Sequence, residues 1–509
     1  MSGSAPIRAH YAPQRRTMAH RAFLAVALCL IAVQQLAARD GKSNPNQAGS
    51  NASNVTALVG GTVIDLSNWG RSAHDLHDAV VLIHDNRIAD VGPRSSVTIP
   101  KNARVIDCTG KYIVPGYVDG YAGMSTQGQA NANLYMGVTT VAAASDARRG
   151  PVYLGANPSP HIYLIDSAGS TDNWSLLARQ PEWSTLLYQR EHATELSADD
   201  TARQLEATAK LGTRVIKISS NITAANTQWI INRAHQQGLV TYGIFVATPY
   251  RVGIESGVDA LPFLAHYELG SIPEELQRPL SEDSDGAAAD TAFDYAERIP
   301  PNDRRLLAYA KLLGSHHAVL MPAFSNYYLQ LPGHRNLWKE PAAKLLEPAH
   351  LSTPPDPETG ELYYPLSPWT HRLPAIGQRY LEDNLRKKAE LAAHKLWSIN
   401  QTIFRDEPHY LAASGSPIGG TMPGISLHTE MELLVRLGLS PREALAAATG
   451  NYSLAFGWNE LGAVLPGRRA DILILDADPT ENIWNARRFS TLLLDGNVLD
   501  RESLLKLKK

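Results

Sequence analysis

The segment VIDCTGKYIVPGYVDGYA (residues 105–122) marks the point at which the character of this chain changes. Before it, residues 55–112 consist of short β-rich pieces, with a hairpin-type turn at Asp85 and Asn86. After it, apolar strand-like runs alternate with helical stretches, a pattern typical of a parallel sheet with crossover helices. The segment therefore predicts a border between a small β domain and a larger α/β domain.

Eight strand-like runs follow one another between residues 113 and 458. They are IVPGYVDGYA, TTVAAAS, HIYLIDSA, RVIKISS, LVTYGIFVA, ALPFLAH, AVLMPAF and HYLAASGS. Eight such units over roughly 340 residues predict an α/β fold, a (β/α)8 TIM barrel with insertions. A doubly wound sheet is the alternative, and it would show a glycine-rich phosphate loop after its first strand.

The longest insertion, residues 326–374, separates the seventh run from the eighth and is rich in tyrosine, tryptophan and proline. Because it leaves the carboxyl end of a strand, we expect it to cover the barrel mouth as a lid or to form a subunit contact. A rigid surface decoration is the alternative. Residues 376–400 then predict a long amphipathic helix.

The first 38 residues have the layout of a secretory signal peptide: arginines, an apolar run over residues 22–33, then Ala37 and Ala38. An uncleaved anchor is the alternative, although the apolar run is short for a membrane span. Residues 39–54, rich in Asn, Ser and Gly, predict a flexible linker. We therefore expect an exported protein, periplasmic or secreted, with attachment to the membrane through this segment as the alternative.

Composition narrows the function classes. The chain has 509 residues, 44% hydrophobic content and a formal net charge of -3, so it predicts a large core and no nucleic-acid partner. Beyond the leader the only cysteine is Cys108, which excludes an intramolecular disulfide there and predicts a buried structural thiol.

Several phrases resemble the amidohydrolase superfamily, in particular its prolidase-like and imidazolonepropionase-like members. Besides residues 105–122, these are NLYMGVTTV (133–141), RVIKISS (214–220) and the long phrase of residues 423–457 that begins PGISLHTEMELL. The resemblance covers essentially all of the chain after the linker. It implies a TIM barrel over residues 113–458 beside a β-sandwich that both chain ends build, from residues 55–112 and 459–509.

The positions at which the family carries metal ligands are occupied by other residues here. The His-x-His pair after the first strand falls on Tyr121 and Gly123, and the histidine after strand five falls on Gly243 or Ile244, depending on the alignment. The strand-six histidine falls on Phe263 or, with a slip of the alignment, near His266, and the strand-eight aspartate falls on Gly415. We therefore expect no metal cofactor, since a catalytic divalent ion usually needs three protein ligands. One Zn held by relocated ligands is the alternative.

Of the family's usual set, the resemblance leaves Lys217, where the family has a carbamylated lysine, and His266 as the candidate catalytic pair. Lys217 is interpreted as a strand-end lysine that pairs with a carboxylate, or alternatively as a nucleophile with a lowered pKa. Other polar residues near strand ends are expected to line the pocket: Asp146, Ser219, Glu268, Ser325 and Ser414.

Two functions remain as hypotheses. The first is an exported pseudoenzyme that binds a small-molecule or peptide-like ligand, as a homo-oligomer or as the non-catalytic partner of an active paralogue. The second is a hydrolase of amide or peptide C–N bonds with a reduced or relocated metal site, or a metal-free mechanism that uses His266, Lys217 and a lid residue.

Overall fold

Gly116 separates two strands that belong to different sheets in the computed structural model. That model describes residues 55–506 except 147, 172, 174–175, 177–178, 181–194, 283–286, 297 and 363–374. Strand β5 (Tyr112–Pro115) pairs antiparallel with β14 (Ile472–Leu475), whereas β6 (Tyr117–Ala122) pairs parallel with β7 (Val138–Ala144). A Cβ atom on Gly116 would lie 2.1 Å from Oγ1 of Thr139, so only glycine fits this junction. The single run predicted from the sequence is therefore two strands.

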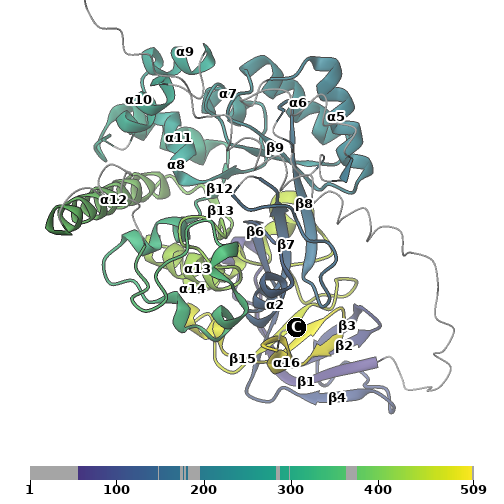
Figure 1. Cartoon of the computed structure of the whole chain (residues 1–509). Coiled ribbons are helices and arrows are strands. Elements are labelled where there is room, and N and C mark those ends of the chain that lie inside the picture. Colours follow the sequence, from purple (N-terminus) through teal and green to yellow (C-terminus); the bar gives the residue numbers. More distant parts are fainter. Residues whose placement is uncertain are drawn as a thin grey trace, which may run out of the picture. The chain divides into compact units, whose positions relative to one another are not determined.

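Both chain ends contribute to one eight-stranded mixed sheet (Figure 1). Its order is β16-β15-β14-β5-β1-β2-β3, with β4 paired to β1. The remaining bounds are β1 Val55–Val63, β2 Leu76–His84, β3 Arg87–Pro93, β4 Arg104–Asp107, β15 Phe489–Leu494 and β16 Asn497–Leu499. Apolar side chains from the two ends, among them Leu58, Ile113 and Ile472, share one buried cluster. The two ends therefore fold together, as expected, while their description as a sandwich stays a prediction.

A second group of parallel strands follows chain order. Strands β6, β7, β8 (His161–Ala168), β9 (Val215–Ile218) and β10 (Val240–Gly243) are neighbours, as are β11 (Leu261–Pro262), β12 (Val319–Met321) and β13 (His409–Tyr410). A parallel bridge from Tyr242 to Ala260 connects the two groups. The N–H of Gly415, just after β13, donates to the Tyr121 carbonyl oxygen at 2.9 Å. The predicted α/β class with parallel strands is thus confirmed.

Helices connect these strands. The longer ones are α2 Gln127–Tyr135, α5 Ala198–Lys210, α6 Ala224–Gln236, α9 Glu274–Glu282, α10 Ala287–Ala296, α11 Arg304–Ser315, α12 Ala375–Phe404 and α13 Ile425–Leu437. The shorter ones are α7 Tyr250–Glu255, α8 Leu264–Tyr267, α14 Pro441–Ala447, α15 Asn451–Phe456 and α16 Arg501–Leu504. Local sequence explains their starts: Asp303 caps α11, and Ser440 with Glu443 forms a capping box on α14. Helix α12 confirms the helix predicted over residues 376–400.

The insertion after β12 is built from short 3-10 turns as far as the structure describes it. These are η5 Phe324–Gln330, η6 Leu337–Lys339, η7 Pro341–Leu345 and η8 Pro348–His350. Buried leucines such as Leu329, Leu337 and Leu345 pack them into the main hydrophobic core. Residues 363–374 lie outside the described part, as do the predicted leader (1–38) and linker (39–54).

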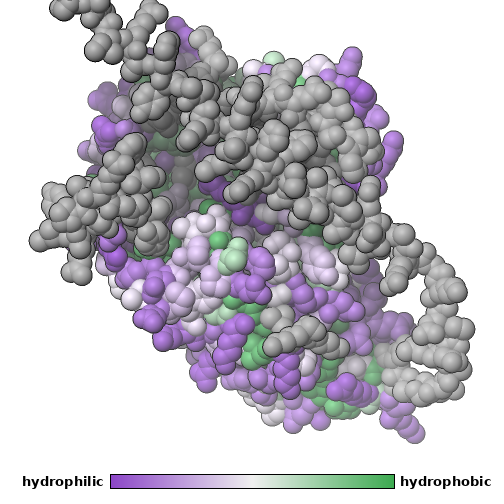
Figure 2. Space-filling view, viewed as in Figure 1, coloured by the Kyte–Doolittle hydropathy of each residue, from purple (hydrophilic) through white to green (hydrophobic). Residues whose placement is uncertain are grey.

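Hydrophilic and hydrophobic residues are interspersed on the molecular face in Figure 2. Large exposed apolar side chains of the described residues lie on separate elements, for example Val105 on β4, Leu307 on α11 and Leu391 on α12. Scattered apolar residues of this kind are normal for a protein surface. Within the described residues, no helix is both long enough and apolar enough to span a membrane.

Candidate functional site

A cavity of about 570 Å³ opens at the carboxyl ends of the parallel strands. Its wall comes from seven parts of the fold: Tyr121 (β6); Asp146, Arg148 and Arg149 (after β7); Lys217 (β9); Ile244 (after β10); Phe263 and His266 (after β11); Asn326, Tyr327 and Gln330 (η5); Ile418 and Gly419 (after β13). Ligands bind at this end of the strands in parallel α/β folds. We therefore take this cavity as the candidate functional site.

Arg149 is the most constrained side chain of the cavity wall, with 5% of its side chain exposed. Its guanidinium group donates to Oδ2 of Asp146 at 2.5 Å, to the Gly415 carbonyl oxygen at 3.1 Å and to the Ser416 carbonyl oxygen at 3.3 Å. It also lies over the ring of Tyr121, 4.9 Å from the ring centre. Arg149 therefore joins the loop after β7 to the chain beyond β13.

The pKa of Asp146 shows how strongly this ion pair is held. Burial alone would raise that pKa, but the charge of Arg149 and the backbone N–H groups of Arg149 and Arg148 together lower it. Both N–H groups donate to Oδ1 of Asp146, at 2.9 and 2.8 Å. The carboxylate is thus ionised and already occupied, which leaves it a poor candidate for an incoming ligand.

Three of the expected metal-ligand positions surround Arg149. Tyr121 stacks beneath its guanidinium group, and the Gly415 carbonyl oxygen accepts from it. A Cβ atom on Gly123 would lie 2.8 Å from Cβ of Arg149, closer than real side chains approach. At Gly415, where φ is +65°, a Cβ atom would lie 2.5 Å from Oδ1 of Asn326. Gly123 and Gly415 therefore have no room for the histidine and aspartate that the family resemblance implies, and Tyr121 occupies the third position with a phenol ring.

The position expected after strand five is equally closed. A Cβ atom on Gly243 would lie 2.4 Å from the ring of Phe245. Among the described residues, the structure places no group of three His, Cys, Asp or Glu ligand atoms in the cavity wall. The residues present therefore do not fit the metal centre of the family.

Lys217 and His266 do line the same cavity, as predicted. His266 lies on α8, whose start follows the positive φ of Phe263 (+64°). Burial, together with the positive charges of Arg148 and Lys217, lowers the pKa of His266 to about 4. The imidazole is therefore neutral at pH 7, and its Nδ1 atom is buried without a hydrogen-bond partner.

Two buried carboxyl groups lie behind the cavity. The backbone N–H of Ser414 donates to Asp119 at 2.8 Å, and that of Ser325 donates to Glu430 at 2.7 Å. Ser325 also donates from its hydroxyl to the Ser414 carbonyl oxygen at 2.8 Å, which connects the two. Burial raises the pKa of Asp119 to about 6 and that of Glu430 to about 8. Ser325 and Ser414 thus support the cavity from behind and are absent from its wall.

The other site residues predicted from the sequence fall into two groups, those that line the cavity and those that do not. Tyr121, Asp146 and Phe263 line the cavity, whereas Ser219 and Glu268 are buried outside its wall. Gly123, Gly243 and Gly415 shape the backbone around it. Sequence reasoning missed Arg148, Arg149 and Gln330; the available signal was a pair of arginines directly after the second barrel strand.

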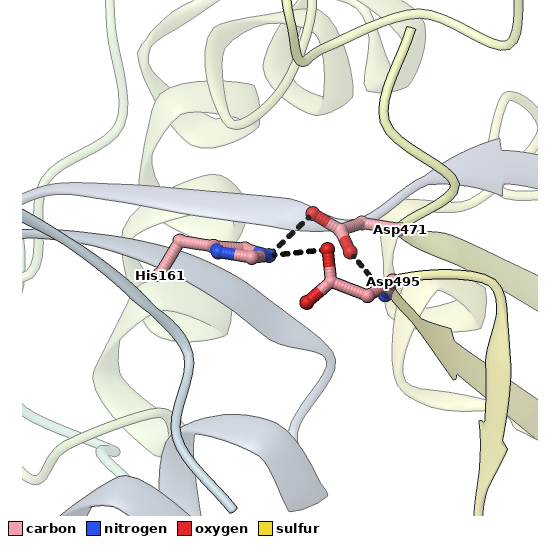
Figure 3. A group of neighbouring side chains, drawn as sticks. All are labelled: His161, Asp471 and Asp495. Carbon is pink, nitrogen blue, oxygen red and sulfur yellow. Dashed lines mark hydrogen bonds and ion pairs between the residues drawn. The ribbon is translucent and has the colours of Figure 1, made fainter. Parts of the chain in front are cut away.

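A second cluster lies at the other end of the parallel strands, where His161 begins β8 (Figure 3). Its Nε2 atom lies 3.2 Å from Oδ2 of Asp471 and 3.5 Å from Oδ1 of Asp495. Asp471 already accepts from Arg469 at 2.8 Å and from the backbone N–H of Asp495 at 2.9 Å. With both oxygens of Asp471 occupied, the cluster is best described as an ion pair that joins β8 to the sheet of the chain ends.

Comparisons with known proteins agree with this architecture. The sequence profile of the amidohydrolase family matches residues 384–500. Imidazolonepropionase from Deinococcus deserti is 39% identical over 80 residues, 13% of this chain and 20% of the relative, so the match spans one fifth of that enzyme. The solved structure of bottromycin amidohydrolase has a TM-score of 0.57 at 18% identity and covers 89% of both chains. Molinate hydrolase has a TM-score of 0.55 at 15% identity, covering 89% of this chain and 96% of its own.

Proposed function

We propose that this chain, which is similar to amidohydrolases over residues 384–500, binds a small-molecule or peptide-like ligand in its barrel mouth without a metal centre. Arg149 carries the proposal, because it lies against Tyr121, Gly123 and Gly415. A guanidinium group fixed at that place supplies positive charge. Hydrogen bonds hold it there, and no metal ligand is needed. We take the scaffold to be a (β/α)8 barrel with a sandwich-type domain from both chain ends.

The proposal extends to the setting of the protein. A leader of signal-peptide layout supports export, and an intact scaffold beside replaced ligand positions supports a pseudoenzyme. Such a protein would act alone, as a homo-oligomer, or with an active paralogue as its catalytic partner.

Elemental mass spectrometry tests the central point. The purified chain is dialysed against zinc, then against zinc-free buffer, and its metal content is measured. We expect less than about a tenth of a zinc ion per chain, because the three-ligand minimum is not met. One or more tightly held zinc ions per chain would overturn the proposal.

Hydrolysis of C–N bonds is the second candidate function, and the family relationship supports it. The specific observation in its favour is that Lys217 and neutral His266 line one cavity, so that a lysine charge and a proton acceptor are close together. An acceptor whose pKa is about 4 is a weak base at neutral pH, which favours the binding function.

Turnover assays separate the two functions. Release of free amine from N-acyl amino acids and dipeptides is followed with the wild-type chain, His266→Ala and His235→Ala. His235 serves as the matched control, because it lies on α6 and pairs with Asp259 outside the cavity. Turnover lost only in His266→Ala would establish hydrolysis, whereas no turnover in any variant supports binding alone.

A further inference from the structure

The charges around the cavity are unequal. The described wall carries Arg148, Arg149 and Lys217 against a single carboxylate, Asp146. That carboxylate is already occupied by Arg149 and two backbone N–H groups. His266 adds no negative charge. Lys217 has an interaction of its own, so Arg148 supplies the positive charge that no described carboxylate balances. Low-dielectric surroundings strengthen its attraction for an anion.

The two arginines have different roles. Arg149 uses its guanidinium group on Asp146 and two carbonyl oxygens, so it contributes charge but few available donors. Arg148 is exposed and forms no ion pair with another described residue. A free guanidinium fork matches a carboxylate with two parallel hydrogen bonds. Arg148 is thus the donor that an incoming anion would meet.

Arg148 and Lys217 act on one region of the cavity. Both side chains line the same cavity as His266, and the charge of each lowers the pKa of that histidine. Lys217 is half-buried on β9 and contributes to the wall. An anion near His266 would therefore meet the positive charges of Arg148, after β7, and Lys217, on β9. The neutral imidazole of His266 would add a hydrogen-bonding group.

The cavity wall also carries apolar side chains. Tyr121 and Phe263 meet edge to face with ring centres 4.8 Å apart, and Ile244 and Ile418 line the same cavity. A volume of about 570 Å³ lies in the range that holds a small organic molecule. The cavity therefore favours a ligand that carries both an apolar group and an anionic group.

We propose that the cavity binds an organic carboxylate with an apolar side group, its carboxylate held by Arg148 and Lys217. This inference rests on the proposed binding function and names its ligand class. It assigns Lys217 to anion binding as an ammonium group, in place of the metal-bridging role that the family resemblance implies.

Isothermal titration calorimetry tests the inference with matched ligand pairs. The probes are phenylacetate, N-acetyl-L-leucine and N-acetyl-L-phenylalanine, each compared with its uncharged amide, in buffer with a metal chelator. We expect at least one carboxylate to bind, and its amide to bind at least about tenfold more weakly, since a charge-assisted hydrogen-bond pair is lost. Affinity that is equal for acid and amide, or absent for all three acids, overturns the inference.

Variants then locate the site. Arg148→Gln and Lys217→Met are each expected to weaken binding about tenfold. Arg104→Gln is the matched control, because Arg104 is an exposed arginine on β4 outside the cavity wall. Equal effects of Arg148→Gln and Arg104→Gln would overturn the assignment. Binding of inorganic phosphate with none of the carboxylates would also overturn it.

The zinc content of the same sample is measured separately. Stoichiometric zinc together with preference for the carboxylate would reject the metal-free proposal and leave the anion site standing. Absence of zinc together with equal affinity for acid and amide would reject the anion site alone.

Discussion

The guanidinium carbon of Arg149 lies 4.9 Å from the centre of the Tyr121 ring, directly where the family resemblance implies a metal ligand. The same guanidinium group bonds Asp146 from one side and carbonyl oxygens beyond β13 from the other. One side chain therefore joins the loop after β7 to the chain beyond β13 at the cavity mouth. Substitution of this residue should reveal how much stability it contributes.

Arg149→Met should lower the free energy of unfolding by about 2–4 kcal/mol, because it leaves a partly buried carboxylate and two carbonyl oxygens without their donor. Urea unfolding measures the change. Arg104→Met on exposed β4 is the control and should change stability by less than about 0.5 kcal/mol. Similar losses in both variants would contradict the structural role of Arg149.

Gly123→Ala should destabilise the chain by about 1–3 kcal/mol, since the new Cβ atom would meet Cβ of Arg149 at 2.8 Å. Thermal unfolding of this variant is compared with Gly155→Ala, where the nearest group is the side chain of Tyr153 at 3.2 Å and the residue is exposed. If Gly123→Ala lowered the thermal stability no more than Gly155→Ala does, the residues around the cavity mouth would be able to shift and accept the new Cβ atom.

Glu430→Gln should change the dependence of stability on pH. Burial raises the pKa of Glu430 from 4.5 to about 8, so the folded state binds its proton more tightly than the unfolded state does. This carboxyl group therefore lowers the stability of the wild-type chain as pH rises from about 4.5 to about 8. The variant keeps an oxygen for the Ser325 N–H and lacks the titration. In urea unfolding, the stability of the variant relative to wild type should be greater at pH 8.5 than at pH 5. A stability difference that is the same at both pH values would exclude the raised pKa of Glu430.

His235 should titrate above the ordinary histidine range of about 6.5. Its hydrogen bond to Asp259 raises its pKa against the opposing effect of burial, with Nε2 and Oδ2 2.8 Å apart. The hydrogen bond to Asp259 stabilises the folded chain fully when the pH is below the pKa of His235 in the unfolded state. This stabilisation is lost as the pH rises through the pKa of His235 in the folded state. NMR titration of the His235 ring should show the raised value, and Asp259→Asn should lower it. An unchanged titration in Asp259→Asn would rule out this partner.

Cys108 should react slowly with iodoacetamide in the native chain. Burial raises the pKa of its thiol to about 11, and the side chain is fully enclosed. Peptide mapping by mass spectrometry should show labelling of the Cys108 peptide in concentrated urea and little without it. Rapid native labelling would mean that the sheet of the chain ends opens readily.

The sequence was sufficient to predict the α/β class with parallel strands, but it was insufficient to predict the site. Periodicity and phrase spacing located the parallel strands and α12, because these depend on local patterns of apolar residues. Arg149 escaped notice because its partners, Asp146 and the carbonyl oxygens of Gly415 and Ser416, meet only after the barrel has brought β6, β7 and β13 together. Every residue has a backbone carbonyl oxygen, so acceptors of this kind cannot be recognised from a sequence motif.

Lys217 and His266 were found, because strand-end residues converge in any parallel barrel. Ser219 and Glu268 were predicted for the same reason, yet they are buried outside the cavity wall. Ser219 follows the last residue of β9, and Glu268 begins the 3-10 helix η4 (Glu268–Ser271), so the alternation of a strand did not determine where either side chain points.

Pairing of β5 with β14 also determines when the fold can be finished. Residues 112–115 are made early during translation, whereas residues 472–475 leave the ribosome near the end of synthesis. Until then one edge of β5 lacks its hydrogen-bonding neighbour, and exposed strand edges favour aggregation. Nascent chains, and fragments that stop before residue 472, should therefore depend on chaperones in a way that the completed chain does not.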